Sequence, residues 1–222
     1  MITTSAQLRD DVSARCPSEM PEGLPRRFTF AEYLAMAESG ILKKDERTEL
    51  IEGQINVMLP VGHPHHRCVL KFVRKLHDHL PGDQWAIISQ VTVEFENGIA
   101  PEPDICIARG TPGAFDERYP TIDECAYVIE VSESSLHYDR GKKLSLYAKL
   151  GISHYWIVNL IDRTIEAYSE PDHLDPDSKQ IYKCRVIHKE HDSITMCFPG
   201  ESDLVFTVAE ILPKFSSGRN QS

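Results

Sequence analysis

The sequence of 222 residues has no apolar run that approaches the length of a membrane-spanning helix, which takes about 20 residues. Its first 16 residues, MITTSAQLRDDVSARC, contain no apolar core of the kind found in secretory signals. These two absences favour a cytoplasmic protein. The six cysteines include no Cys-x-x-Cys pair, which argues against a structural zinc site and favours buried free thiols.

Three catalytic motifs are also missing. The sequence contains no G-x-x-x-x-G-K-[ST], no G-x-G-x-x-G and no G-x-S-x-G, which disfavours P-loop nucleotide hydrolysis and serine-hydrolase chemistry. Basic residues are outnumbered, with 24 Lys and Arg against 34 Asp and Glu and a net charge of -10. This balance argues against binding nucleic acid through bulk electrostatics, although carboxylates that bind a metal would contribute to it.

Hydrophobic patterning predicts the main helices and strands. A capping box that begins at Thr29 starts one helix, and apolar residues at helical spacing predict another over residues 65–80. Alternation over residues 86–95 predicts a half-buried strand, and Asn97-Gly98 predicts a hairpin turn after it. Further strands are expected within residues 48–58, 105–108, 126–131, 154–160, 164–168, 180–188 and 193–198, and a further helix at 139–150.

These elements add up to an α+β fold with a central mixed β-sheet, flanked by helices and extended by β-hairpins. Residues 26–213 are expected to form a single domain. Residues 1–25 are polar and carry three prolines without a sustained period, which predicts a flexible arm. Residues 214–222 are expected to form a disordered tail.

A carboxylate stands inside one of the most apolar stretches. Glu130 lies within residues 126–131, where a buried charge is costly unless it binds a cation or a partner. Asp104, which follows Pro103, immediately precedes another short apolar run. If the two strands are neighbours, both carboxylates meet at one rim of the sheet. They would then offer hard oxygen ligands for Mg²⁺ or Mn²⁺, with the backbone carbonyl of Val131 as a further ligand. In the alternative interpretation, Asp104 caps a turn and Glu130 pairs with a lysine.

Two adjacent lysines, Lys142 and Lys143, follow on the expected helix. Their side chains point about 100° apart, so one of them at most faces such a site. Lys143 lies four residues from both Asp139 and Tyr147 and shares their helical face, which favours Lys143. A lysine there would orient a water molecule and stabilise charge that develops on a phosphate. The alternative is a solvated salt bridge between Asp139 and Lys143.

Three closely spaced histidines offer a different kind of metal site. His63, His65 and His66 are ligands that suit Zn²⁺ or Ni²⁺. Pro64 is expected to break the helical spacing that would bring His63 towards a later ligand. The favoured interpretation is therefore a loop that leads into a helix.

These patterns resemble a large bacterial family of restriction-endonuclease-like proteins within the PD-(D/E)XK nuclease superfamily. The resemblance covers about residues 28–212. It is carried by ELIEG at 49–53, the histidine at 65, Pro-Asp at 103–104 and the block VIEVSESS…YDRGKKLSLYAKLGISHYWIV. It implies a central mixed sheet flanked by helices and Mg²⁺-dependent cleavage of phosphodiester bonds, with DNA as the expected substrate.

The resemblance also assigns roles to the residues of the expected site. Asp104 matches the first motif aspartate, and Glu130 matches the second acidic position. The superfamily lysine belongs two positions after Glu130, where this sequence has Ser132. The resemblance implies that Lys143 takes its place from the following helix.

Five further positions receive supporting roles. Glu49 matches a third acidic residue and is expected beside the metal, while His65 is expected to touch the site or a phosphate. Ser135 and Asp139 are expected to position the helix that carries the lysine, and Gln90 to lie near the metal-bound water.

The leading hypothesis is therefore a metal-dependent DNA endonuclease in which water attacks a phosphate in line. The alternative is a catalytically inactive nuclease-fold module that binds nucleic acid or a protein partner, as the acidic composition and the serine at position 132 suggest. A homodimer is a further expectation, because nucleases that cut both strands often act as pairs. The sequence identifies neither a target site nor a choice between DNA and RNA.

Overall fold

The computed structural model describes residues 25–43, 45–93, 98–172 and 181–214. The expected N-terminal arm and C-terminal tail therefore lie almost entirely outside the described residues. None of the described helices is long and apolar enough to cross a membrane.

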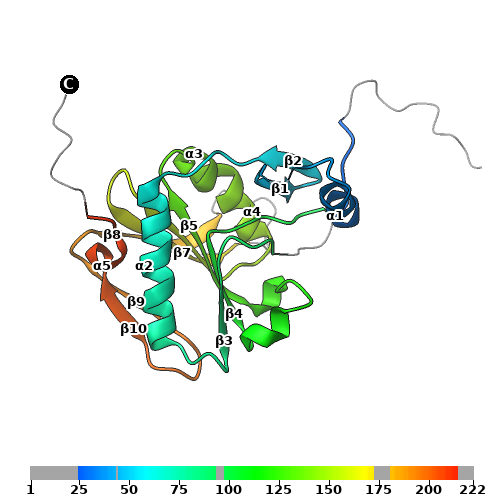
Figure 1. The fold of residues 1–222 in the computed structure, drawn as a ribbon. Coiled ribbons are helices and arrows are strands. Elements are labelled where there is room, and N and C mark those ends of the chain that lie inside the picture. The colour runs from blue at the N-terminus through cyan, green and yellow to red at the C-terminus, as the bar shows by residue number, and fades with distance from the viewer. Residues whose placement is uncertain (1–24, 44, 94–97, 173–180, 215–222) are drawn as a thin grey trace, which may run out of the picture.

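A six-stranded mixed sheet forms the centre of the molecule (Figure 1). Its spatial order follows the chain from β3 to β8. The β5–β6 pair is parallel, whereas every other neighbouring pair in this sheet is antiparallel. The expected mixed sheet is thus confirmed. Its strands are β3 (Trp85–Ile88), β4 (Ile105–Arg109), β5 (Cys125–Ser132), β6 (His154–Asn159), β7 (Thr164–Pro171) and β8 (Tyr182–Lys189).

Helices cover both faces of this sheet, as expected for the fold class. Helix α2 (His63–His79) packs on one face, where Phe72 and Leu76 join a buried cluster that includes Ile129 of β5. The opposite face is covered by a composite helix of α3 (Leu136–Tyr138), the π-helical turn η3 (Asp139–Lys143) and α4 (Leu144–Lys149). Here Tyr147 packs in a second cluster that includes Val128. Because strand side chains alternate, Glu130 lies on the face of Val128, towards this composite helix.

Smaller elements extend the core. The hairpin of β1 (Thr48–Ile51) and β2 (Gln54–Val57) turns through Glu52 and Gly53, both at positive φ. A Cβ on Gly53 would lie 2.7 Å from Cβ of Arg27, so glycine is required there. Helix α1 (Phe30–Glu38) begins at the expected capping box, and the remaining elements are β9 (Ser193–Met196), β10 (Leu204–Thr207), α5 (Val208–Ile211) and the 3₁₀ turns η1 (Pro112–Phe115) and η2 (Ile122–Glu124).

The strand expected over residues 86–95 was wrong over residues 89–93, because β3 ends at Ile88, and residues 94 and 95 lie outside the described residues. Gln90 adopts a φ of 54°, and its backbone N–H donates to the carbonyl of Asp104 at 3.2 Å. This left-handed residue bends the chain away from the sheet, so the later alternation does not mark a strand: Val93 is fully buried, whereas Val91 is 39% exposed. Asn97, half of the expected turn, lies outside the described residues.

Two helix starts also differ from expectation. Helix α2 begins at His63, not at residue 65, because Pro64 occupies the first turn, where its missing N–H costs no hydrogen bond. The third helical segment begins at Leu136, earlier than residue 139, and contains a π-turn in place of regular α-helix.

Replacing Phe72 with alanine should lower the free energy of unfolding by about 3–5 kcal/mol, because its ring is fully buried against Phe206, with 5.6 Å between ring centroids. Leu70→Ala is the matched control, since Leu70 lies on the same helix but is 68% exposed. Urea denaturation measures both variants. Equal losses would contradict the packing of α2 described above.

Candidate active site

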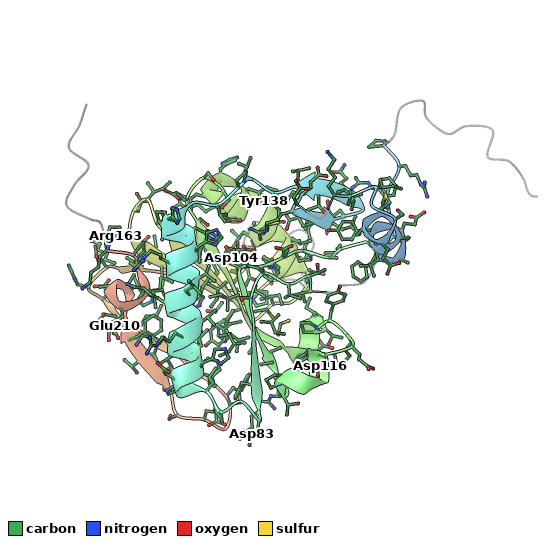
Figure 2. The ribbon with its side chains drawn as sticks, in the orientation of Figure 1. Asp83, Asp104, Asp116, Tyr138, Arg163 and Glu210 are labelled. Carbon is green, nitrogen blue, oxygen red and sulfur yellow. The ribbon has the colours of Figure 1, made fainter. Side chains whose placement is uncertain are left out.

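Four charged side chains from different elements line one cavity of about 340 Å³. Asp104 ends the loop before β4, Glu130 lies on β5, Lys143 ends the π-turn and Glu49 lies on β1. Each of these residues is 5% or less exposed. The cavity lies at the end of the sheet where α2 begins, and Figure 2 labels Asp104 and Tyr138 there.

The ammonium group of Lys143 is held between two carboxylates. Its Nζ donates to Oε1 of Glu130 at 2.9 Å and lies 3.4 Å from Oε2 of Glu49. Two tyrosines complete the cluster: Tyr147 donates to Oε1 of Glu130 at 3.0 Å, and Tyr138 donates to Oε1 of Glu49 at 3.0 Å. The site thus joins the β1–β2 hairpin, the sheet and the composite helix through one buried network.

Burial and charge act on these groups in opposite directions. Burial raises the pKa of Glu130 well above its usual range, and the positive charge of Lys143 offsets part of this rise. Burial would lower the pKa of Lys143, but Glu130, Glu49 and Asp139 outweigh it and raise the pKa above the ordinary value. The surrounding carboxylates therefore favour the protonated, positively charged form of Lys143.

Asp104 is fixed by two neighbours. Its Oδ2 accepts a hydrogen bond from the backbone N–H of Val131 at 2.8 Å and one from Nε2 of His65 at 2.9 Å. His65 is itself buried, and its Nδ1 has no hydrogen-bond partner. Because His65 lies in the first turn of α2, this contact couples the start of that helix to the loop before β4.

The π-turn is held from inside by Asp139. Its Oδ2 accepts hydrogen bonds from the hydroxyls of Ser132 and Ser135, both at 2.6 Å, and its backbone carbonyl accepts one from Tyr155 at 3.1 Å. Burial raises the pKa of Asp139, opposed by Lys143 and the two serines. Ser132, at the position expected for the superfamily lysine, thus orients the turn that supplies Lys143.

The same turn is held from outside by an arginine. Nε of Arg140 donates to Oε1 of Glu166 at 2.9 Å, and the side chain of Glu166 is fully buried on β7. Arg185 and Tyr168 each donate to Oε2 of Glu166 at 2.9 Å. Burial alone would raise the pKa of Glu166, but these donors, led by Arg140, lower it. The π-turn is therefore anchored to the sheet on both sides.

The structure brings together seven of the eight residues that the sequence singled out. These line the cavity: Glu49, His65, Asp104, Glu130, Ser135, Asp139 and Lys143. Gln90 does not line it and contributes a backbone hydrogen bond to the loop of Asp104. Lys142 does not line it either, so the choice of Lys143 over its neighbour agrees with the geometry.

Sequence reasoning missed Tyr138, Arg140 and Glu166. Tyr138 precedes Lys143 by five residues, the spacing of a π-helix, and its ring centroid lies 6.0 Å from the lysine Nζ. Helical spacing of three or four residues does not find this pair. Arg140 and Glu166 lie 26 residues apart in the sequence, so no local spacing indicates their contact.

The carboxylate oxygens of Asp104 and Glu130 are donors of the kind that a hard divalent cation prefers. The hydrogen bonds described above end on one oxygen of Asp104 and one oxygen of Glu130, so the second oxygen of each takes part in none of them. Oε2 of Glu49 is buried and accepts no hydrogen bond. Mg²⁺ usually binds one or two protein carboxylates and completes its shell with water and phosphate oxygens.

Within the part of the chain that the structure describes, no group of three or more His, Cys, Asp or Glu residues is placed so that it could hold a metal ion. This includes the three histidines near the start of α2. His65 turns towards Asp104, while His63 and His66 are exposed. The described geometry thus does not support the histidine alternative.

The fold is shared with a solved structure. A crystal structure of a putative nuclease belonging to DUF820 from Anabaena variabilis superposes with a TM-score of 0.63 at 15% sequence identity. The match covers 83% of this chain and 97% of that chain. At this identity the likeness establishes the shared fold alone.

The family follows from the sequence match. The Uma2 family model, described as putative restriction endonuclease, matches residues 30–204. The chain therefore belongs to the Uma2 family, as the resemblance to restriction-endonuclease-like proteins indicated. No curated protein matches the chain.

Lys143→Met should lower the free energy of unfolding by about 3–5 kcal/mol at neutral pH, because it leaves Glu130 buried without its counter-charge. The double variant Glu130→Gln/Lys143→Met should recover most of this loss. Burial raises the pKa of Glu130, so the loss depends on pH. The free energy of unfolding of the single variant should be closest to that of the wild type at acid pH, where Glu130 is protonated. The difference should grow as pH rises through the raised pKa of Glu130.

Urea denaturation across a pH series, with a chelator present, measures these effects. Lys142→Met is the matched control and should change stability little, because Lys142 lies outside the cavity. A single variant as stable as the wild type, or a double variant no better than the single, would contradict the buried ion pair.

Proposed function

We propose that the protein is a metal-dependent endonuclease that hydrolyses phosphodiester bonds of DNA in this cavity. The observation that carries the proposal is the convergence of Asp104, Glu130 and Glu49 with the buried ammonium group of Lys143 in one cavity. Membership of a family described as putative restriction endonucleases supports the same reaction class.

Asp104 and Glu130 are the residues that would hold Mg²⁺ or Mn²⁺, with Glu49 and the carbonyl of Val131 beside them. When bound, the ion would neutralise phosphate charge and lower the pKa of a water molecule. His65 and the N–H of Val131 keep the Asp104 carboxylate in one orientation. The carboxylates thus form a preorganised acidic pair at the base of the cavity.

Lys143 serves the phosphate in this proposal. Its raised pKa keeps the ammonium group charged, so it donates hydrogen bonds to phosphate oxygens as negative charge develops there. The oxygen of the attacking water bonds to phosphorus as the water gives up a proton to solvent, while the bond from phosphorus to the leaving sugar oxygen breaks and that oxygen takes up a proton from solvent. The hydrogen bonds of Asp139 and Arg140 keep the π-turn, and hence Lys143, in place during this step.

A specific observation favours a second candidate, a nuclease-fold module without turnover. Lys143 already pairs with Glu130 and approaches Glu49, so the lysine satisfies charges that a metal would otherwise neutralise. Such a module would bind nucleic acid or a protein partner without any dependence on a divalent cation.

Purified protein should cut plasmid DNA when Mg²⁺ or Mn²⁺ is present, and Asp104→Asn or Glu130→Gln should each reduce the rate by at least about 100-fold. Asp83→Asn is the matched control, because this exposed residue lies at the opposite end of the sheet (Figure 2). Gel assays of nicked and linear products measure the rate.

Two results would count against the nuclease. One is the absence of any cleavage with either ion, and the other is undiminished cleavage by both site variants. The first result, combined with binding that ignores divalent cations, would favour the module without turnover.

A further inference from the structure

Five consecutive apolar residues border the cavity on the side of the β1–β2 hairpin. Residues 57–61, VMLPV, begin at the last residue of strand β2 and are separated from α2 by Gly62, and all five line the cavity. We call this segment the apolar lip. Val57 and Leu59 are 64% and 65% exposed, Pro60 is exposed, and Met58 and Val61 are half-buried. Several exposed apolar side chains beside a site point to a contact that covers them.

The reactive groups lie below this lip. Asp104, Glu130 and Lys143 are each 5% or less exposed, so a phosphate must enter the cavity to reach them. A flexible single strand can bend to bring one phosphate inward. A regular duplex would have to be distorted first, which costs free energy.

The charged side chains around the cavity provide little electrostatic attraction for the phosphates of a duplex. The side chains that line it include five carboxylates and two basic groups, Arg47 and Lys143. Arg47 already pairs with Glu102, with Nε 3.1 Å from Oε1, and Lys143 pairs with Glu130. Duplex binding depends strongly on basic residues that neutralise phosphates, and the chain as a whole has a net charge of -10.

Apolar side chains offer a different source of affinity. In proteins that unstack DNA, side chains such as Leu, Met and Pro insert between base steps that have partly separated. The lip presents these three residue types together as Met58, Leu59 and Pro60.

We propose that the apolar lip contacts unstacked bases, so that the substrate class is single-stranded or locally melted DNA and not regular duplex. This inference rests on the proposed function for its catalytic part. Its binding part is independent of turnover, because a strand held by the lip is bound whether or not it is cut.

Fluorescence anisotropy with three labelled DNAs tests the binding part. The probes are a single strand, its perfect duplex and the same duplex with a central mismatch bubble, each in a buffer without divalent cations. The single strand and the bubble should bind at least about tenfold tighter than the duplex, with a shallow dependence on salt.

In Leu59→Ser and in the double variant Val57→Ser/Leu59→Ser, the preference for the single strand over the duplex should fall by about tenfold, because the substitutions remove apolar contacts with the bases. Val205→Ser is the matched control, since Val205 is 57% exposed on β10 and does not line the cavity. Thermal melts check that the variants are folded, as expected for exposed positions.

Cleavage of the same three DNAs with Mg²⁺ or Mn²⁺ separates the two proposals. Lip-dependent binding of single strands without cleavage would support the lip and refute the nuclease. Cleavage of duplex as fast as single strand would support the nuclease and overturn the lip.

The lip proposal is also overturned if no DNA binds or if Leu59→Ser binds DNA like the wild type. Size-exclusion chromatography of the lip variants tests another occupant. If Leu59→Ser loses dimers that the wild type forms, while its DNA binding is unchanged, the lip is an interface between two copies of the chain and the proposal is overturned.

Discussion

The buried ion pair between Lys143 and Glu130, with Glu49 close by, is the interaction on which the site depends. Removing three charges from water is costly, so the arrangement persists only because each charge meets an opposite one at short range. The three residues belong to the composite helix, the central sheet and the β1–β2 hairpin. Their electrostatic balance therefore constrains how these three parts of the fold pack together.

A second consequence of this pairing concerns the lysine itself. A lysine buried without carboxylates would lose its proton readily and become neutral. Here the surrounding negative charge raises its pKa, which favours the charged form of the side chain. The chain thus combines an acidic overall composition with one reliable cation at the base of the cavity.

Much of the fold could be predicted from sequence, because periodicity reports burial directly. The apolar runs that became β4, β5 and β6 were nearly continuous, as strands buried on both faces require. The convergence of Asp104 and Glu130 followed from one assumption, that β4 and β5 are neighbours, and the register confirms it: Ile105 pairs with Ile129.

Most of the failures depend on contacts distant in sequence. The backbone bond from Gln90 to the carbonyl of Asp104 bends the chain where alternation indicated a straight strand. Glu166 was missed because its partners Arg140 and Arg185 lie 26 and 19 residues away in the sequence. Pro64 has a local cause: it was expected to break helical spacing, yet in a first turn it costs no hydrogen bond.

Because of the π-turn, the geometry of the site depends on how many residues the segment Asp139–Lys143 contains, as well as on which residues they are. A π-turn closes five-residue hydrogen bonds where an α-helix closes four, so it accommodates one additional residue. Deleting any one residue from Asp139–Lys143 would return the segment to α-helical register and rotate the preceding side chains by about 100° relative to α4. Among related sequences, a one-residue gap at this turn would therefore distinguish chains in which Asp139 and Lys143 no longer share the cavity, even where both residues are retained.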